Sequence, residues 1–402
     1  MQIRPILAAL SRHRIAAFLI GAEIALACAI LCNALFLITA RLDMMRVDSG
    51  VDENRLVVLS LDGVDDGTAS DLAARLRAGF AGIAGVQSVA VANAMPFTQR
   101  AGEFGFRLRA DDPHYNHQGH IYVGGPNFAS TLGLQLAAGR WFSPDEYGPV
   151  GDFLPESRAV MVDSAYASTL WPGESPLGKM IYVSGEDGYR VVGTYRSLVR
   201  PDPDPSHTHN SLLMAGVPGK HLASVYVLRT GPEQTARVLD AARALVTRVA
   251  PTVVINDAAT GTEVALRRQY FARDRAMAGM LVGVIAALLL VTALGIVGLA
   301  SFWVQQRRKQ IGVRRALGAT RGDIVRYFQT ENFLIVSFGI LFGMVLAFGL
   351  NLVLMSRYEL PRLPLYYLPF GALALWALGQ LAVLAPALRA SHVPPVVATR
   401  SV

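Results

Sequence analysis

The stretch "RRKQIGVRRALGAT", Arg307–Thr320, carries the densest positive charge in the chain and stands between two long apolar runs. Five of its fourteen residues are Arg or Lys. We expect Gly312 and Gly318 to break the helix here, because glycine is a poor helix former and tolerates backbone conformations that other residues avoid. A basic segment between two apolar runs indicates a loop held on one side of a membrane.

The composition supports a membrane protein. Of the 402 residues, 52% are hydrophobic and 17% are charged, whereas soluble domains carry about 25% charged residues. The net charge is +7, and the segment from Gln305 to Tyr327 alone holds seven basic residues and one acidic residue. Because the charge is confined to a loop between apolar runs, it favours contact with membrane lipid and argues against nucleic acid as a partner.

Four runs are long and apolar enough to be transmembrane helices. They are residues 15–40, 276–304, 331–355 and 367–388. The first would extend about 39 Å as a helix, enough to cross a hydrocarbon core of about 30 Å. A cleaved signal peptide is the alternative for this run, and "ALAC" at Ala25–Cys28 resembles a lipoprotein cleavage site. The apolar core of a signal peptide is shorter, so we expect a retained anchor.

The distribution of basic residues predicts the orientation. Arg4, Arg12 and Arg14 precede the first span, and Arg389 and Arg400 follow the fourth. With four spans, both groups and the loop at 305–330 fall on one side, which should be cytoplasmic. The N-terminus (1–14) and the C-terminus (389–402) are then cytoplasmic. In a bacterial inner membrane, residues 41–275 and the short loop 356–366 then face the periplasm.

The segment 41–275 has the pattern of a mixed α/β domain. Strand-like runs such as "RLVVLSLD" (Arg55–Asp62) alternate with helical patterns such as "TASDLAARLRAGFAGI" from Thr68. The predicted fold class is therefore a membrane α-helical protein with four transmembrane helices and a large α/β extracytoplasmic domain inserted between spans one and two. The length of the segment favours two interleaved subdomains.

Small residues in the spans predict close helix packing. Gly279 and Gly283 lie four residues apart, as do Gly339 and Gly343, and such pairs let helices approach closely in lipid. Chance is the alternative, since glycine is common in transmembrane helices. The only cysteines, Cys28 and Cys32, are also four apart. We interpret them as small packing residues and expect no disulfide.

One stretch nearly matches a phosphate-binding loop. "GESPLGKM" (Gly173–Met180) resembles GxxxxGK[ST], but Met180 has no hydroxyl group to hold Mg²⁺ and Pro176 removes a backbone donor. We therefore expect a plain turn here. No other stretch matches a nucleotide-binding loop, so we expect no catalytic residues, no cofactor and no ATPase activity in this chain.

Histidines cluster in the extracytoplasmic segment. His114, His117 and His120 are spaced by three residues and follow Asp111 and Asp112. Outward-facing histidine clusters can bind Zn²⁺ or Cu²⁺, but nothing fixes these rings on one face. We expect a solvated loop without a metal. The second pair, His207 and His209, lies in a proline-rich loop.

Glu23 is a carboxylate about one third of the way into the first span. Ionisable residues in lipid are costly and are usually functional. It is a candidate intramembrane polar site, with helix packing as the alternative.

The residues after the basic stretch predict a helix start. Thr320 and Asp323 have the spacing of a capping box. We expect a short helix from Thr320 that lies flat on the membrane face. Ile324, Val325 and Phe328 would give it an apolar face at helical spacing. A solvated basic loop that only sets topology is the alternative.

The whole passage "RRKQIGVRRALGATRGDIVRYF" (Arg307–Phe328) resembles the permease signature of the MacB/FtsX family of ABC transporters. The matching positions of its cytoplasmic motif are Arg307, Arg308, Lys309, Gly312, Arg314, Arg315 and Gly318. The stretches 132–146 and 165–195 look like the family's periplasmic core domain, and 386–400 looks like its C-terminal motif. Gln310 departs from the Glu that the family usually has, which puts the role of that acid in doubt here.

The resemblance implies a permease subunit that forms a dimer with a second copy or a paralogue. A separate ABC ATPase subunit would bind ATP and Mg²⁺. ATP-driven closure would move the transmembrane helices and change the shape of the periplasmic domain. The residues expected to couple the permease to the ATPase are Thr320, Asp323, Ile324, Val325 and Phe328.

Two functions fit this resemblance. The first is export or extraction of an amphiphilic substrate, such as a peptide, a macrolide-like molecule or a lipid-linked molecule, with a periplasmic adaptor and an outer-membrane channel as further partners. The second is an FtsX-like regulator that transmits the state of the ATPase to a periplasmic enzyme without transporting a substrate. A membrane sensor without an ATPase is a third reading, and the basic docking motif argues against it.

Overall fold

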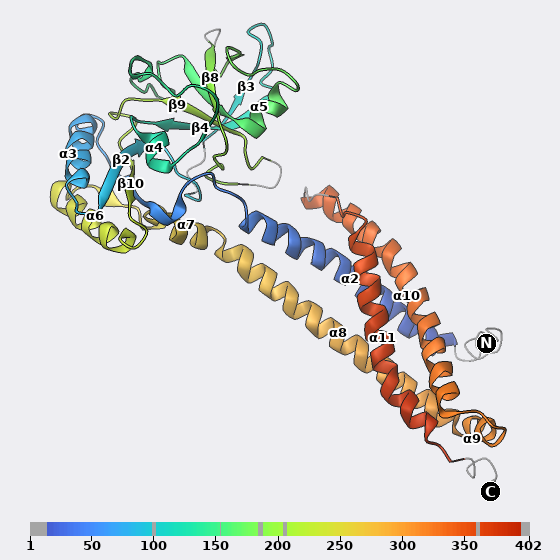
Figure 1. Ribbon diagram of the computed structural model, residues 1–402. Coiled ribbons are helices and arrows are strands. Elements are labelled where there is room, and N and C mark those ends of the chain that lie inside the picture. The colour runs from blue at the N-terminus through green and yellow to red at the C-terminus, as the bar shows by residue number, and fades with distance from the viewer. Residues whose placement is uncertain are drawn as a thin grey trace. The chain divides into compact units, whose positions relative to one another are not determined.

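The structure is a computed structural model that describes residues 14–98, 102–152, 154–183, 188–203, 207–358 and 362–394. The chain divides into two compact units (Figure 1). One, here called the membrane unit, consists of Met1–Asp43 and Asp274–Val402. The other, here called the α/β domain, is Met44–Arg273. Arg4, Arg12 and Arg400, on which the predicted orientation partly rests, lie outside the described residues.

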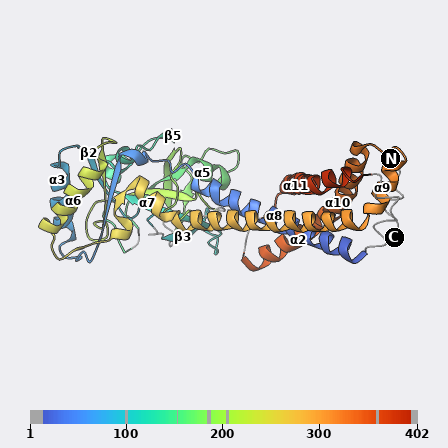
Figure 2. The ribbon, with the colours of Figure 1, turned by 90° about the horizontal axis from the view of Figure 1, so that it is seen from below.

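Among the described residues of the membrane unit, four helices are long and apolar enough to cross a membrane. They are α2 (Arg14–Met45), α8 (Ala272–Gln306), α10 (Arg321–Tyr358) and α11 (Tyr367–Ser391). A short helix, α9 (Arg308–Ala316), lies at the end of the unit where α8 ends and α10 begins (Figures 1 and 2). The predicted fold class is confirmed: the chain has four candidate membrane helices and an α/β domain inserted in the sequence between the first and the second of them.

Two predictions about the basic stretch are wrong. No separate flat helix follows Thr320, because α10 runs without a break from Arg321 into the third span. The separate short helix is α9, and it passes through Gly312. A glycine costs a helix only about 1 kcal/mol relative to alanine, and Gly312 is buried against neighbouring elements, so packing outweighs that cost. Gly318 does end the helix, with a φ of +99° that favours glycine.

The α/β domain is built on one mixed sheet in two halves. The first half has the order β11 (Val254–Ile255), β1 (Leu56–Asp62), β10 (Val225–Thr230), β2 (Val86–Ala92). The second continues with β4 (His117–Gly124), β9 (Ser211–Ala215), β6 (Ala159–Asp163), β8 (Tyr189–Tyr195) and β5 (Leu136–Gly139). The halves are joined through the pair Ala92 and Gly124. The chain therefore starts the first half, builds the second and returns to the first.

Short strands and helices complete the domain. Strand β12 (Gly261–Thr262) pairs with β1, β3 (Glu103–Phe106) with β4, and β7 (Met180–Ile181) with β8. The helices are α3 (Ala69–Ala81), α4 (Phe128–Leu132), α5 (Ser164–Leu170), α6 (Thr235–Val249) and α7 (Glu263–Tyr270). Three 3-10 turns are η1 (Glu53–Arg55), η2 (Pro144–Glu146) and η3 (Asp257–Ala259).

Strands β1, β10 and β2 of the first half carry buried side chains on both faces. Val57 and Leu59 of β1 pack in one core cluster with residues of α3 and α6, and Leu56 and Val58 pack in another with residues of α4. Successive side chains of a strand point to opposite faces. This explains why β1 is buried without a break from Leu56 to Leu61 and does not alternate between apolar and polar residues.

Glycines bring α2 and α10 together, as predicted for one of the two pairs. A Cβ at Gly343 would lie 2.5 Å from Cβ of Cys28, and one at Gly339 would lie 2.8 Å from Cβ of Ile24. Cys28 and Cys32 are free and buried, in agreement with their interpretation as small packing residues. At the other pair, Gly279 and Gly283, the described residues place no atom within 4 Å of an added Cβ, so the chain itself does not pack closely there and close packing of this pair stays a prediction for a helix outside the chain.

We predict that Gly343→Val destabilises the membrane unit, because the added side chain collides with α2. Overpacking of a tight contact costs about 1–3 kcal/mol. Thermal unfolding of the full chain in detergent measures the loss, and Gly279→Val is the matched control because its side chain would meet no atom of the chain. Equal melting temperatures for the two variants would contradict the packing described here.

Candidate functional site

The basic stretch is held in place by a buried ion pair. Arg307, at the junction of α8 and α9, donates two hydrogen bonds to the carboxylate of Glu331 on α10, with N–O distances of 2.9 and 2.7 Å. Both side chains are buried, and the guanidinium carbon lies 5.6 Å from the ring centroid of Trp303. Removing one partner of a buried pair costs about 3–5 kcal/mol, because the other charge is left unpaired. The pair therefore fixes the end of α8 against α10.

Two further arginines fasten α9 to its neighbours. Arg314 lies over the ring of Tyr327 on α10, 4.6 Å from the centroid. Arg315 donates to the backbone carbonyl of Ser391 at the end of α11, at 2.5 Å. With Arg307 at its start, α9 is connected to α8, α10 and α11. It is a fixed part of the membrane unit and not a loose loop.

The turn from α9 to α10 has the predicted capping chemistry. The N–H of Thr320 donates to the Asp323 carboxylate at 3.0 Å, and the N–H of Asp323 donates to the Thr320 hydroxyl at 3.2 Å. This is the reciprocal geometry of a capping box. Before it, the N–H of Ala319 donates to the carbonyl of Arg314 and that of Gly318 to the carbonyl of Arg315, which is a Schellman ending of α9.

Two of the predicted coupling residues, Ile324 and Phe328, are buried within the chain, whereas Thr320 and Asp323 are exposed, and their role stays a prediction. Ile324 and Phe328 are each 3% exposed and pack with Ile311 of α9. The rest of that cluster consists of Ala387, Ala390 and Val393, with Val325 partly buried against it. The apolar face predicted for a flat helix is therefore covered by the chain's own α9 and α11 region, because the helix that carries it is the start of a span.

The exposed face of α9 instead carries residues that the sequence analysis missed. Val313 of α9 is 43% exposed, and Leu317, the residue that caps the C-terminal end of α9, is 83% exposed. Residues four apart lie on one side of a helix. Arg308, Lys309 and Gln310 are exposed on the same helix. The sequence signal was an apolar pair at i, i+4 in a helix otherwise rich in arginine. Glu331 was also missed, although it is an acid at the edge of an apolar run.

Glu23 lies against α8. Its carboxylate oxygen is 2.7 Å from the position that a Cβ of residue 295 would occupy. Gly295 therefore gives this half-buried side chain the room that any other residue would fill. The structure places Glu23 between two spans, and its role stays a prediction.

The near-match to a phosphate loop forms a turn between α5 and β7. The ammonium of Lys179 pairs with the carboxylate of Glu174 at 2.5 Å. The N–H of Gly178 donates to the carbonyl of Val191 on β8 at 2.8 Å. The lysine and the glycine N–H that a phosphate loop would use are thus engaged within the turn and its neighbouring strand.

The three histidines do not form one site. His114 is exposed on a loop, His117 stacks on Phe106, and His120 is 1% exposed within β4. The predicted solvated loop is wrong for the last two, because residues 117–124 form a strand that pairs with β3 and β9. Across the ranges that the structure describes, no group of three or more His, Cys, Asp or Glu is placed to hold a metal ion.

Burial makes His120 sensitive to acid. Desolvation, together with the nearby positive charge of Arg200, lowers the pKa of His120 from 6.5 to about 3. The imidazole is therefore neutral in the folded state at neutral pH, while it is protonated below pH 6.5 in the unfolded state. A lowered pKa contributes stability above pH 6.5 that is lost as the pH falls toward 3.

We predict that this histidine sets part of the acid sensitivity of the α/β domain. Between pH 6.5 and 4, the free energy of unfolding should fall by about 1.4 kcal/mol per pH unit from His120 alone. His120→Phe should remove that part of the slope in thermal unfolding, and the exposed His114→Gln should leave it unchanged. An unaltered slope in His120→Phe would show that another group is responsible.

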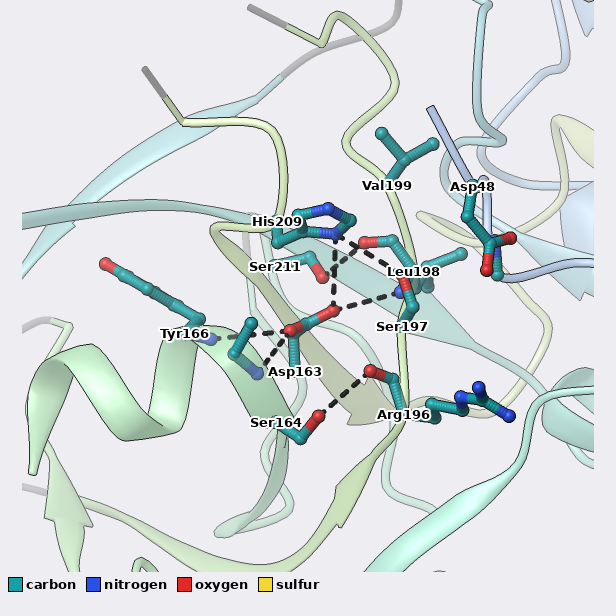
Figure 3. Close-up of polar contacts among 12 residues, drawn as sticks. Asp48, Asp163, Ser164, Tyr166, Arg196, Ser197, Leu198, Val199, His209 and Ser211 are labelled. Atoms are coloured by element: carbon teal, nitrogen blue, oxygen red, sulfur yellow. Dashed lines mark hydrogen bonds and ion pairs between the residues drawn. The ribbon is translucent and has the colours of Figure 1, made fainter. Parts of the chain in front are cut away.

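A buried carboxylate organises the second half of the sheet (Figure 3). Asp163, at the end of β6, is fully buried and accepts from the N–H groups of Ala165 and Tyr166 at the start of α5. Its other oxygen accepts from the N–H of Leu198 at 3.1 Å. Burial raises the pKa of Asp163, while the backbone N–H groups and the nearby His209 oppose the rise.

The same region brings Ser197, His209 and Asp163 together, but not as a hydrolase relay. Nδ1 of His209 lies 3.3 Å from the hydroxyl of Ser197 and 3.8 Å from the Asp163 carboxylate. A nucleophile relay needs the serine at one ring nitrogen and the acid at the other. Here the same nitrogen faces both, so the group holds the segment 197–199 in place.

Comparison with known proteins agrees with this architecture. The family model described as MacB-like periplasmic core domain matches residues 24–260, and the one described as FtsX-like permease C-terminal matches residues 282–395. The first alone covers more than half of the chain. The chain belongs to the MacB/FtsX family of ABC transporter permeases.

Several relatives are similar to this permease. The macrolide export ATP-binding/permease protein MacB of Bartonella henselae is 30% identical over 299 residues, which are 68% of this chain and 41% of that protein. The MacB of a Shewanella strain is 25% identical over 57% of this chain and 35% of its own length. This chain thus spans well under half of either protein. The ABC transporter permease YknZ of Bacillus subtilis is 22% identical over 68% of each chain.

Two solved structures align with part of this chain. The periplasmic region of MacB from Actinobacillus actinomycetemcomitans aligns with a TM-score of 0.35 and 13% identity, over 55% of this chain and 93% of that one. The extracellular domain of YknZ aligns with a TM-score of 0.32 and 16% identity, over 50% of this chain and all of that one.

Proposed function

We propose that this chain is the permease subunit of a MacB-like ABC transporter. It couples ATP hydrolysis by a separate ATPase subunit to a conformational change of the α/β domain, for export or extraction of an amphiphilic substrate. The proposal rests mainly on two features of α9, which are its attachment to three spans and its exposed apolar side chains. This helix is fastened to three spans by Arg307, Arg314 and Arg315, and it presents Val313 and Leu317 to solvent.

The exposed face of α9 is suited to contact an ATPase. Contiguous exposed apolar surface rimmed by polar residues marks contact sites, and Val313 and Leu317 lie one helical turn apart beside the exposed basic residues of α9. Leu317 follows the basic residues of α9, whose charge can steer an acidic partner surface and can also attract anionic lipid, at about 1 kcal/mol per Lys or Arg near the surface. Movement of α9 would be passed to α8, α10 and α11 because it is bonded to each of them.

The proposal includes the orientation. The chain lies in a bacterial inner membrane. The basic segment 305–327 is in the cytoplasm, where ATP is available, and the α/β domain is in the periplasm. A second copy or a paralogue completes the permease. The uncovered glycine face of α8, with Gly279 and Gly283, supports a helix contact outside this chain.

A cavity in the α/β domain favours an amphiphilic substrate over a purely regulatory role. It has a volume of about 320 Å³, within the range of about 300–1,000 Å³ that small-molecule sites show. Its lining includes Phe128, Trp141, Phe142, Tyr147 and Leu213 and no charged side chain. An FtsX-like regulator would use the same contact at α9 but has no need for an aromatic cavity.

The loop that carries three of these aromatic residues is rigid. Arg140 donates two hydrogen bonds to the carboxylate of Glu146, at 2.7 and 2.8 Å. The N–H of Ser143 donates to the same carboxylate at 2.8 Å. The hydrogen bond from Arg140 lowers the pKa of Glu146 to about 2, so the pair remains charged at every pH the cell meets. A preformed aromatic wall costs less to order on binding.

We predict that Leu317→Asp separates the permease from its ATPase without unfolding it. The substitution places a charge at the centre of the proposed contact, at a position where the chain itself packs nothing. Tagged full-length chain, purified from its native membranes, should bring down Mg²⁺-dependent ATPase activity, and the variant should lose at least nine tenths of it. Thermal unfolding of the variant should match that of the parent.

Gln310→Asp is the control, because it adds the same charge to an exposed position on α9 and removes no apolar side chain. It should retain the copurified ATPase. Normal ATPase recovery with Leu317→Asp would overturn the proposed contact. Absence of any ATPase with the parent chain would overturn the proposed function.

A further inference from the structure

One arginine joins the two segments that connect the α/β domain to the spans. The incoming segment is Met44–Asp52, which begins with the last two residues of α2, and the outgoing segment is α7 with Phe271, which precedes α8. Arg267 of α7 donates to the backbone carbonyls of Met45 and Val47 at 2.8 and 2.6 Å. It also pairs with the carboxylate of Glu53. Three acceptors on the incoming side therefore hold one guanidinium from the outgoing side.

The surroundings of this arginine are fixed on both sides. The hydroxyl of Ser49 donates to the Glu53 carboxylate at 2.5 Å. The guanidinium carbon lies 5.2 Å from the ring centroid of Phe97, which packs on Tyr270 and Phe271 at 5.7 and 5.6 Å between centroids. Phe97 has a φ of +60° although it is not glycine. Such backbone is unfavourable for a residue with a side chain and persists only where the surroundings enforce it.

The incoming segment then docks on residues 197–199. The N–H of Val199 donates to the carbonyl of Ser49 at 3.1 Å. Gly50 has a φ of +78°, and a Cβ there would lie 2.0 Å from the carbonyl oxygen of Ser197. Any side chain at residue 50 would therefore separate the two segments. Because the contact joins the backbones of residues 49–50 and 197–199 directly, a displacement of one segment displaces the other.

Residues 198 and 199 are in turn tied to three neighbouring strands. Leu198 donates its N–H to Asp163 of β6 at 3.1 Å, and its carbonyl accepts from the hydroxyl of Ser211 of β9 at 2.7 Å (Figure 3). The carbonyl of Val199 accepts from the hydroxyl of Tyr122 of β4 at 2.7 Å. Strands β4, β9 and β6 are adjacent in the second half of the sheet.

From this arrangement we infer that Arg267 is a positioning residue for the transport cycle, locking the incoming and outgoing segments into one element that passes movement of the spans to strands β4, β9 and β6 through residues 197–199. The inference rests on the proposed function for its biological role. The lock itself is a property of the α/β domain and can be tested without an ATPase.

Amide hydrogen exchange of the full chain in nanodiscs tests the lock. Arg267→Gln removes the charge that pairs with Glu53, and its shorter side chain does not extend to the position of the guanidinium nitrogen that donates to both carbonyls. Exchange of the amides at 45–50 and of Val199 should rise about tenfold or more, because hydrogen bonds to charged groups are among the stronger ones. Arg268→Gln, one position along the same helix and exposed, is the matched control and should leave exchange unchanged. Unchanged exchange in Arg267→Gln would overturn the proposal.

A distance measurement tests the transmission. Spin labels at the exposed positions Ala78 on α3 and Ser168 on α5 report on the two halves of the sheet. In the complex with its ATPase, ATP should change the label distance in the parent and in Arg268→Gln. In Arg267→Gln the change should be lost, while ATP hydrolysis stays within about twofold of the parent. If Arg267 only stabilised the fold, Arg267→Gln would lower the melting temperature but leave the ATP-dependent change in label distance in place.

Arg267→Lys guards against misfolding, since it keeps the positive charge, but its single nitrogen cannot occupy both the position that pairs with Glu53 and the position that donates to the two carbonyls. It should fold with the stability of the parent and still lose most of the distance change. A full change in Arg267→Lys and Arg267→Gln would overturn the transmission role. Absence of any ATP-dependent change in the parent would instead count against the proposed function, and the exchange experiment would still decide the lock.

Discussion

The membrane unit depends on the pairing of Arg307 with Glu331. Neither charge can be buried alone at the edge of the spans without a cost of several kcal/mol, so the end of α8 and the start of α10 must meet where the two side chains meet. The Arg307–Glu331 contact therefore fixes which face of α9 packs against α10. Ile311 then faces inward against α10, and Val313 and Leu317 face outward. The surface proposed for the ATPase thus follows from one buried ion pair.

The α/β domain uses the same chemistry at its connection to the spans. Arg267 gathers Glu53 and two backbone carbonyls, as Arg307 gathers both oxygens of Glu331. A planar guanidinium with five donors can hold several acceptors in a fixed geometry, which a lysine cannot do. Both arginines lie at junctions between a span and another element. Under the proposed function, movement passes between the spans and their neighbouring elements at these junctions, so the geometry of each junction must be kept.

The sequence was sufficient for the parts of the structure that local patterns determine. Hydropathy predicted four spans, the Thr320–Asp323 spacing predicted a capping box, and the motif from Arg307 predicted the family. It failed where long-range packing decides. Gly312 stays helical because α9 is packed, and Ile324 is buried because α10 continues into a span. His120 lies in a strand because β3 and β9 pair with its segment. Pairings such as Arg307–Glu331 or Arg267–Met45 leave no periodic trace in a single sequence.

A double-mutant cycle on Arg307 and Glu331 tests the central claim that this pair holds α9 for transmission. The single variants Arg307→Met and Glu331→Met should each destabilise the full chain by about 3–5 kcal/mol, and each should uncouple the ATPase from the α/β domain. The double variant, with no charge left unpaired, should regain most of the stability. It should remain uncoupled, because α9 is no longer fixed by a directional contact. Single effects that add in the double variant, or full coupling without the pair, would contradict the account.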